Sequence, residues 1–416
     1  MYLLKIQDYK VFGLTMDRIK ELLTKKNRRR LANRLFYLAL MIELILMIVE
    51  KSELVFSCES YVFRITFVIT FLAVIITDHG NRQWALIITA WIFTFACYRL
   101  TGKNDLLRLA TFIMAGKNIN LGKTMKLMFW TCLIGFTTIA LLSVTGVLGH
   151  VAIVSDFGRE NEQELRYAFG FGHPNTLWGC AYALMLLWIW IYGSKAKWWH
   201  FALVALTNLG LYKVTASRTS LMIGAFTIIL AVLVRYVPRI STKKTAYILT
   251  VIITPVLCVA FSIWSACVSY IPRYFIRNKY EDFINILDDH LNNRIHNLYR
   301  ANNRHAGAID SWKLFSDHES VEYFDMGWVR IIYWYGIIPA AVICVLLIIF
   351  IYLCYKRKDA WTLIVVLSLS MYTVIEATFV SEYIGRNILL PVLAVYFGSY
   401  SLDKRMLFES FVRKEK

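Results

Sequence analysis

Long apolar segments are the feature of this 416-residue chain that most limits how it can fold. A helix that crosses the hydrocarbon core of a bilayer needs roughly 17–25 mostly apolar residues, and blocks of about that length recur between residues 33 and 402. Hydrophobic residues make up 58% of the chain, against about 45–50% in an ordinary soluble protein. Because most of the blocks lack a polar face, we predict an integral membrane protein.

The pattern predicts an all-α, polytopic membrane protein with about twelve transmembrane helices. The fourth span is the weakest, because it is short and carries Arg108. The predicted spans are residues 33–49, 61–77, 84–99, 104–116, 127–148, 175–192, 198–213, 218–235, 245–265, 328–354, 361–378 and 386–402.

The net charge of +18 follows from where lysine and arginine lie between the spans. Alternate threading puts every basic cluster on one side, which the positive-inside rule identifies as the cytoplasm. Both termini are then cytoplasmic, and the charge gives no reason to expect a nucleic-acid partner. The basic clusters lie in residues 25–30, 117–126, 195–197, 239–244, 356–358 and 404–416.

This threading divides the chain into three parts. Residues 1–32 form a basic cytoplasmic segment, in which residues 17–26 predict an amphipathic helix lying on the membrane surface. Residues 33–402 form the transmembrane domain, and residues 403–416 a basic cytoplasmic tail. The eight cysteines lie mostly within spans without a C-x-x-C pair, so we expect no disulfide framework, no metal site and no cofactor.

One large exterior loop, residues 266–327, is too long to be a simple connection. It contains one apolar stripe of helical spacing, formed by Ile284, Leu287, Leu291, Ile295 and Leu298. Arg294 falls at the edge of that stripe, so its side chain either reaches the surface that the helix covers or extends along the interface. The neighbouring Asp288 and Asp289 are interpreted as solvated residues on the outer face.

The stretch SRTS places Arg218 in the first turn of the eighth span, on the exterior side. We expect Ser217 or Thr215 to cap this helix. A helix N-terminus attracts anions, and a guanidinium there suits a diphosphate. The alternative is an arginine that only anchors the helix at the membrane surface.

The stretch RYAFGFGHPNT precedes the sixth span and contains Arg166, His173 and Asn175. Its glycines permit positive φ or a close backbone approach, and Asn175 or Thr176 is expected to cap the helix. The polar side chains are candidate contacts for a sugar or a phosphate. A tight loop leading into a helix explains the same residues without a ligand.

Asp325 lies at the exterior end of the tenth span, in the stretch YFDMGWVR. A carboxylate at this depth can act as the general base for a hydroxyl group. It can equally pair with Arg330 or cap the helix. The sequence has no P-loop, no G-x-S-x-G and no H-E-x-x-H, so these soluble-enzyme chemistries are not expected.

Together these segments resemble the Wzy-type polysaccharide polymerases, which are related to the O-antigen ligases. The resemblance covers most of the chain: many spans, a large late exterior loop, the arginines of SRTSL and LNNRIHNLYRA, and the D-x-G-x(8)-G-I-I segment that begins at Asp325. RYAFGFGHPNT is similar to the variant in capsular and exopolysaccharide polymerases of Gram-positive bacteria. The chain has Met326 where the family often has asparagine, and His318 stays an alternative base.

The resemblance implies a metal-independent glycosyltransferase in the bacterial plasma membrane, acting on an undecaprenyl-diphosphate-linked glycan. Arg218 and Arg294 are expected to hold the diphosphate while Asp325 accepts the hydroxyl proton. Arg166, His173 and Asn175 are expected to bind substrate. The bilayer, a flippase and a chain-length regulator are the expected partners. The alternatives are a ligase-like glycan transferase and a transporter of the same lipid-linked oligosaccharide.

Overall fold

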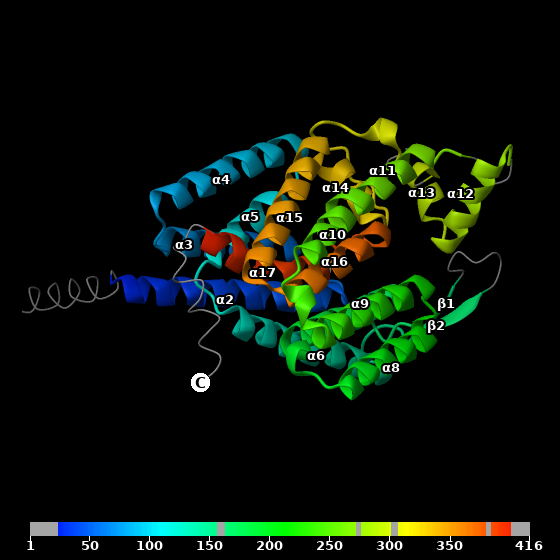
Figure 1. The fold of residues 1–416 in the computed structure, drawn as a ribbon, viewed down its shortest axis with the longest axis horizontal. Coiled ribbons are helices and arrows are strands. Elements are labelled where there is room, and N and C mark those ends of the chain that lie inside the picture. Colours follow the sequence, from blue (N-terminus) through cyan, green and yellow to red (C-terminus); the bar gives the residue numbers. More distant parts are fainter. Residues whose placement is uncertain (1–23, 156–162, 272–275, 301–306, 380–383, 401–416) are drawn as a thin grey trace, which may run out of the picture.

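The computed structural model describes residues 24–155, 163–271, 276–300, 307–379 and 384–400, and Figure 1 shows their arrangement as a bundle of helices. The predicted surface helix over residues 17–26 therefore lies almost wholly outside the described residues, as does the basic tail. The helices are α2 (Lys25–Glu50), α3 (Glu59–Ile76), α4 (Asn81–Thr101), α5 (Asp105–Ala115), α6 (Leu121–Val144), α7 (Pro174–Tyr192), α8 (Trp198–Thr215), α9 (Arg218–Tyr236), α10 (Lys244–Val251), α11 (Val259–Val268), α12 (Lys279–His290), α13 (Arg294–Arg300), α14 (Gly327–Tyr335), α15 (Ile337–Arg357), α16 (Ala360–Ile375) and α17 (Ile384–Tyr400).

Two short strands, β1 (Ala152–Ser155) and β2 (Glu164–Tyr167), form an antiparallel pair that the sequence pattern did not predict. Their register pairs Ile153 with Arg166. The remaining elements are the 3-10 turns η1 (Gly193–Lys195), η2 (Pro238–Ser241) and η5 (Ile309–Ser311) and the π-helical segment η3 (Ile252–Cys258). Pro255 lies inside η3, which joins α10 and α11.

Among the described residues, eight helices are long and apolar enough to cross a membrane. They are Lys25–Glu50, Glu59–Ile76, Asn81–Thr101, Leu121–Val144, Pro174–Lys195, Arg218–Tyr236, Lys244–Val268 and Ile337–Arg357. Shorter apolar helices run over Ala360–Ile375 and Asn387–Gly398. The predicted fourth span contains only α5, whose 11 residues are too short to cross a bilayer unaided.

The predicted tenth span, residues 328–354, is wrong as a single helix. The structure divides it into α14 and α15 at Gly336, which has φ 102°. A Cβ there would lie 2.6 Å from the carbonyl oxygen of Leu314, because the preceding loop crosses the break. Residues other than glycine rarely adopt this conformation, so Gly336 fixes where α14 ends and α15 begins.

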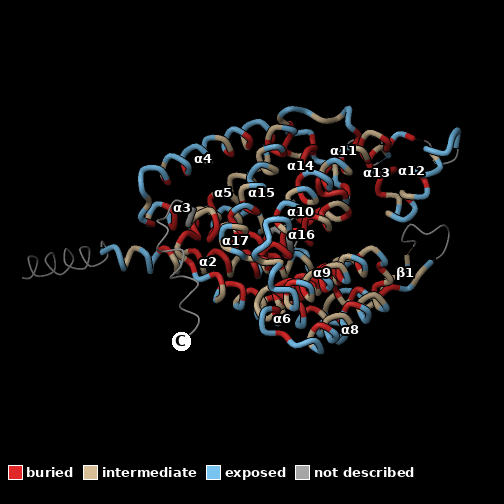
Figure 2. Tube along the Cα trace, in the orientation of Figure 1, coloured by how far each residue is buried: buried red, intermediate tan, exposed pale blue. Residues whose placement is uncertain are grey.

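The bundle buries its centre and leaves apolar side chains on its outside. Figure 2 shows α16 and α17 mostly buried, whereas much of α4 is exposed. Exposed apolar side chains include Ile92, Ile134 and Leu206, at 66%, 65% and 64%. A soluble protein seldom shows so much apolar surface on its helices, and lipid is the solvent that suits it.

The connecting segments contact one another in two groups. At one end, Lys25 pairs with Asp78 at 2.7 Å, and Lys117 donates to Gln83 Oε1 at 2.6 Å. At the other, His150 donates its backbone N–H to Glu53 Oε1 at 2.9 Å. The first group joins segments that the charge pattern assigns to the cytoplasm, and the second joins segments that it assigns to the exterior.

Candidate functional site

The predicted amphipathic helix of the 266–327 loop is wrong as one continuous helix. It divides into α12 and α13, because Asn292 and Asn293 have φ of 54° and 61°. Asparagine tolerates this left-handed conformation better than most residues, since its short polar side chain bonds locally. The break places Arg294 at the start of α13 rather than in the middle of a longer helix.

Asp288 holds this corner together. The prediction that it is solvated is wrong, because only 1% of it is exposed. Its carboxylate accepts the backbone N–H of Ile295 at 2.7 Å and faces the Nδ1 of His296 at 2.7 Å, which ties α12 to the first turn of α13. Asp289 is exposed, as predicted.

Arg294 points into the protein and makes an ion pair with two carboxylates. Its Nη2 donates to Glu376 Oε1 at 2.8 Å, and its Nε lies 3.5 Å from Asp325 Oδ2. Nη1 donates to the carbonyl oxygen of Leu291 at 3.2 Å. Only 5% of the side chain is exposed, which confirms that Arg294 reaches the covered surface and does not extend along an interface.

Asp325 precedes α14 and remains accessible, with 47% of its side chain exposed. It neither caps α14, whose N-cap is Met326, nor pairs with Arg330. The buried Arg330 guanidinium instead donates from Nε to the carbonyl oxygen of Phe324 at 2.8 Å, which fixes the backbone directly before Asp325. The two structural roles expected for Asp325, pairing with Arg330 and capping the helix, are therefore wrong, and Asp325 pairs with Arg294 instead.

Glycine at position 327 lets α14 approach the end of α16. A Cβ there would lie 2.7 Å from Thr373 Cγ2 and 2.9 Å from the carbonyl oxygen of Glu376. Because Gly327 follows Asp325 by two residues, this close approach brings the two carboxylates to the same arginine. A larger side chain would force these two segments apart.

Glu376 is the site residue that sequence reasoning missed. It directly follows α16, and its side chain is 17% exposed. A signal was present, since Glu376 is the one charged residue in the predicted span 361–378, and charges in such spans commonly mark functional sites.

The start of α7 approaches the same cluster. His173 is the N-cap, and its Nδ1 accepts the backbone N–H of Asn175 at 3.1 Å. The predicted side-chain caps Asn175 and Thr176 are therefore wrong. The Asn175 side chain instead donates from Nδ2 to Glu376 Oε1 at 3.4 Å.

The His173 ring lies in the electrostatic field of this cluster. Desolvation lowers the pKa of His173 below its ordinary value; Asp325 opposes the effect, and Arg166 and Arg294 add to it. The ring is then neutral at pH 7, with Nδ1 as the acceptor and Nε2 carrying the proton.

The loop before α7 has the backbone that its glycines predicted. Gly170 and Gly172 have φ of 77° and 69°. The Gly170 carbonyl oxygen accepts the backbone N–H of Glu53 at 3.0 Å, which fixes the loop to the segment after α2. A Cβ on Gly170 would lie 3.0 Å from Ser143 Cβ, so the loop is closely packed as well as turned.

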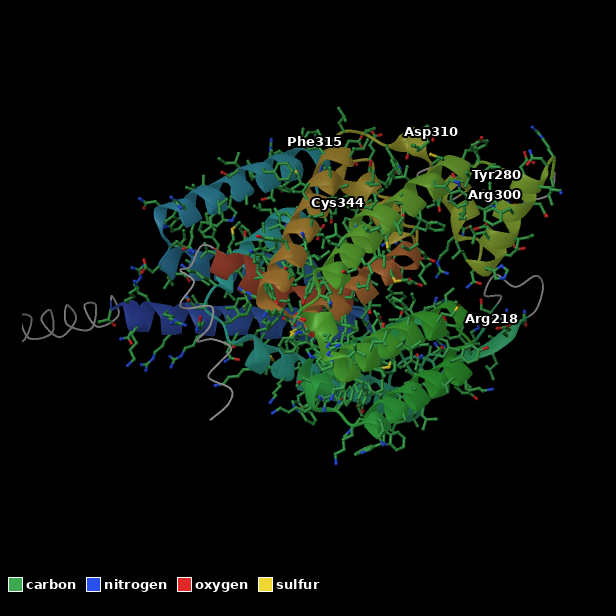
Figure 3. The ribbon with its side chains drawn as sticks, viewed as in Figure 1. Arg218, Tyr280, Arg300, Asp310, Phe315 and Cys344 are labelled. Carbon is green, nitrogen blue, oxygen red and sulfur yellow. The ribbon has the colours of Figure 1, made fainter. Side chains whose placement is uncertain are left out.

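Arg166 and Arg218 occupy different environments. Arg166 on β2 is 5% exposed and pairs with Glu164 at 2.7 Å. Arg218 is exposed in the first turn of α9, and among the described residues its side chain has no ion pair or hydrogen bond. Figure 3 labels it at the end of the molecule that also carries Tyr280 of α12 and Arg300 of α13.

The expected cap of α9 is formed only in part. Ser217 occupies the N-cap position, but its hydroxyl donates to Ser220 Oγ at 2.7 Å and not to a backbone N–H. Thr215 donates back to the carbonyl oxygen of Leu211 at 2.8 Å. The first-turn N–H groups beside Arg218 therefore receive no side-chain cap from either residue.

The alternative base His318 lies elsewhere. Its ring occupies the space beside Gly102, at the turn between α4 and α5. There Lys103 Nζ donates to the carbonyl oxygen of the adjacent Asp317 at 3.4 Å. The described contacts of His318 therefore place it with the α4–α5 turn and not with Arg294.

The ends of four helices thus bring together one buried cation, one exposed carboxylate and one partly buried carboxylate. In the described part of the chain, no group of three or more His, Cys, Asp or Glu side chains is placed to hold a metal ion. The cluster can bind an anion, hydrogen-bond a hydroxyl group and accept a proton. No family model, curated protein or solved structure matches the chain.

Proposed function

We propose that this protein is a membrane glycosyltransferase that polymerises undecaprenyl-diphosphate-linked oligosaccharide repeats on the exterior face of a bacterial plasma membrane. The convergence of Asp325, Arg294 and Glu376 at one end of an apolar helix bundle carries the proposal. A lipid-linked substrate presents its diphosphate and first sugars at that depth. The apolar outer surface of the bundle would face the lipid chain of such a substrate, and the polar side chains at the end of the bundle would face its diphosphate and sugars.

The accessible Asp325 acts as the base in this mechanism. It takes the proton from a hydroxyl group of the incoming repeat, whose oxygen bonds to the anomeric carbon of the donor. The bond from that carbon to the diphosphate oxygen breaks, and the lipid diphosphate leaves with the electron pair. Arg294 Nε lies 3.5 Å from Asp325 Oδ2 and helps to hold this carboxylate at the site.

Arg294 and Arg218 stabilise the leaving diphosphate. Arg218 is exposed and unpaired among the described residues, so it is available to an anion. Arg294 is held by Glu376 until substrate arrives. A proton taken up by Glu376 would break this ion pair and leave the guanidinium charge to the diphosphate.

The polar groups at the start of α7 complete the site. His173 caps α7 with its ring, and the Asn175 side chain donates to Glu376. Both suit the hydroxyl groups of a sugar. Arg166 contributes positive potential from β2 while it remains paired with Glu164. The proposed partners are a flippase that delivers the repeats and a protein that sets chain length.

The test is a gel of the surface polysaccharide from cells that carry the wild type, a deletion, Asp325→Asn or the control Asp289→Asn at matched protein levels. Single repeats from the deletion and from Asp325→Asn, with normal polymer from the control, support the proposal. Long polymer that stays on its lipid carrier indicates a ligase. Normal polymer from Asp325→Asn contradicts its role as base.

A transporter of the same lipid-linked oligosaccharide is the second candidate. One observation favours it: Glu43 and Arg108 lie within α2 and α5, where buried charges are unusual outside transport pathways. A transporter deletion would leave lipid-linked repeats on the cytoplasmic side. A lectin added outside intact cells distinguishes the two cases. It would not bind the repeats of a transporter deletion, but it would bind the exterior single repeats of a polymerase deletion.

A further inference from the structure

An exposed tyrosine, Tyr323, precedes Asp325 by two residues. Tyr323 is 61% exposed, whereas Phe324 and Met326 are 4% and 1% exposed. Exposed and buried residues therefore alternate along this short segment, as they do in extended backbone. The alternation puts Tyr323 and Asp325 on the same side of the chain, and the mechanism proposed above uses only Asp325.

Two side chains of α14 fix the backbone around Tyr323. Trp334 Nε1 donates to the carbonyl oxygen of Glu322 at 2.9 Å, and Arg330 Nε donates to the carbonyl oxygen of Phe324 at 2.8 Å. The carbonyl groups directly before and after Tyr323 are therefore both held by the same helix. The position of the tyrosine follows from α14 and not from the long loop that precedes it.

The ring of Tyr323 is also fixed in orientation. The Arg330 guanidinium lies over one face of the ring, 3.4 Å from its centroid, and Arg330 is 0% exposed. A desolvated cation is attracted to the face of an aromatic ring, so this contact holds the ring flat against the guanidinium. Because one face is covered, the exposed area of Tyr323 lies on the other face and at the ring edges.

An exposed aromatic face of this kind suits a sugar. A pyranose ring has faces made largely of C–H groups, which pack on an aromatic ring while the hydroxyl groups point outward from the sugar's edge. A ring whose orientation is already fixed loses little conformational entropy when a ligand binds to it. Asp325, on the same side of the segment, supplies a carboxylate for one of those hydroxyl groups.

We propose that the outer face of Tyr323 is the stacking surface for the sugar at the non-reducing end of the incoming repeat, the sugar whose hydroxyl group Asp325 deprotonates. The inference rests on the proposed function and adds to it the contact that binds the acceptor. It also defines the class of acceptor sugar, a pyranose with one face that carries only C–H groups.

The test uses the purified full-length protein in detergent and, as the probe, the lipid-linked repeat extracted from deletion cells. Initial rates of polymer formation are measured against repeat concentration for the wild type, Tyr323→Ala, Tyr323→Phe and the control Tyr61→Ala. Tyr61 is a matched control, because it is 63% exposed and the Arg64 guanidinium lies 5.4 Å from its ring centroid.

We expect Tyr323→Ala to raise the KM for the repeat by roughly 2–10-fold, since stacking contributes to binding. The Tm of this variant should match the wild type. Tyr323→Phe keeps the aromatic face and should keep the wild-type KM, as should Tyr61→Ala. If Tyr323→Ala does not fold, Tyr323→Leu decides, because leucine still covers Arg330 but has no aromatic face; its KM should rise as well.

A wild-type KM in Tyr323→Ala, with or without a fall in Tm, would overturn the inference and would mean that the ring only covers Arg330. An equal rise of KM in Tyr323→Phe would assign the effect to the hydroxyl group, and an equal rise in Tyr61→Ala would assign it to anchoring at the membrane surface; either result overturns stacking. No polymer from the wild type contradicts the proposed function and the inference together, whereas polymer made with an unchanged KM by Tyr323→Ala contradicts the inference alone.

Discussion

Arg294 Nη2 donates a 2.8 Å hydrogen bond to Glu376 Oε1, across 82 residues of sequence. This pair joins the loop of residues 266–327 to the end of α16, and Arg294 also lies 3.5 Å from Asp325. Because both side chains are largely buried, neither can lose its partner without leaving a charge in a poorly solvated place.

We expect Glu376→Ala to lower stability and Glu376→Gln to lower it less. Removing one partner of a buried ion pair typically costs about 3–5 kcal/mol, whereas the amide oxygen of glutamine can still accept from Arg294. The Tm of the purified variants measures both effects. Glu319→Ala, which removes an exposed acid of the same loop, is the control. Equal Tm for all three variants would mean that the pair does not stabilise the fold.

Asp325→Asn is expected to remove activity without removing stability. A general base contributes about 10²–10⁴-fold to a rate, while the Asp325 side chain is 47% exposed and its only described ion pair is 3.5 Å long. The rate of polymer formation from a lipid-linked repeat should fall by at least about 100-fold, with Tm unchanged. Asp310→Asn, another exposed acid, serves as the control. A parallel loss of Tm would point to a structural role instead.

Arg218→Ala should slow the same reaction and Arg218→Lys should restore part of the rate. Lysine keeps the charge but loses the bidentate geometry that suits a phosphate. Because Arg218 is exposed, Tm should stay within about 1 °C of wild type. Lys213→Ala removes an exposed positive charge from the neighbouring α8 and should have little effect. If the two alanine variants slow the reaction equally, general positive potential and not a specific contact is responsible.

Gly336→Ala is expected to destabilise the protein by about 2–4 kcal/mol, because alanine is strained at φ 102° and its Cβ would meet backbone atoms at 2.6 Å. The matched control is Gly210→Ala in α8, where a Cβ would meet nothing within 4 Å. There alanine should stabilise the helix by about 0.5–1 kcal/mol. Opposite shifts in Tm would support this reading of the break between α14 and α15, and a neutral Gly336→Ala would contradict it.

Acid should release the contact between Glu53 and the loop before α7. Burial acts to raise the pKa of Glu53, but hydrogen bonds from the His150 backbone and ring outweigh it and lower the pKa below the ordinary value of 4.5. A depressed pKa adds stability above the unfolded value, and that stability is lost as the pH falls through the folded value.

The Tm of the wild type should therefore fall between pH 5 and pH 3 by more than the Tm of Glu53→Gln, which cannot titrate. The two proteins should differ most near pH 7 and converge in acid. A constant difference across this pH range would show that Glu53 acts through packing alone.

The candidate site could be predicted in its parts but not in its pairings. Asp325 and Arg294 were identified from sequence because a charged side chain beside an apolar segment needs a reason to be there. Glu376 was missed although it is the one charge in its predicted span. Its partner Arg294 is 82 residues away in the sequence, and the spacing of residues along the chain does not show which distant side chains the fold brings together.

The sequence by itself determined that the chain forms apolar helices suited to a bilayer, and where most of them lie, because the length of an apolar run depends only on local composition. It also determined the positive φ of Gly170 and Gly172, a property of residue type.

Only the tertiary structure decided where helices break. The divisions at Asn292 and Gly336 are imposed by packing: Asp288 caps α13 from α12, and the backbone near Leu314 crosses beside Gly336. It also decided which carboxylates meet Arg294, since a buried charge is paired by whatever the fold brings within reach.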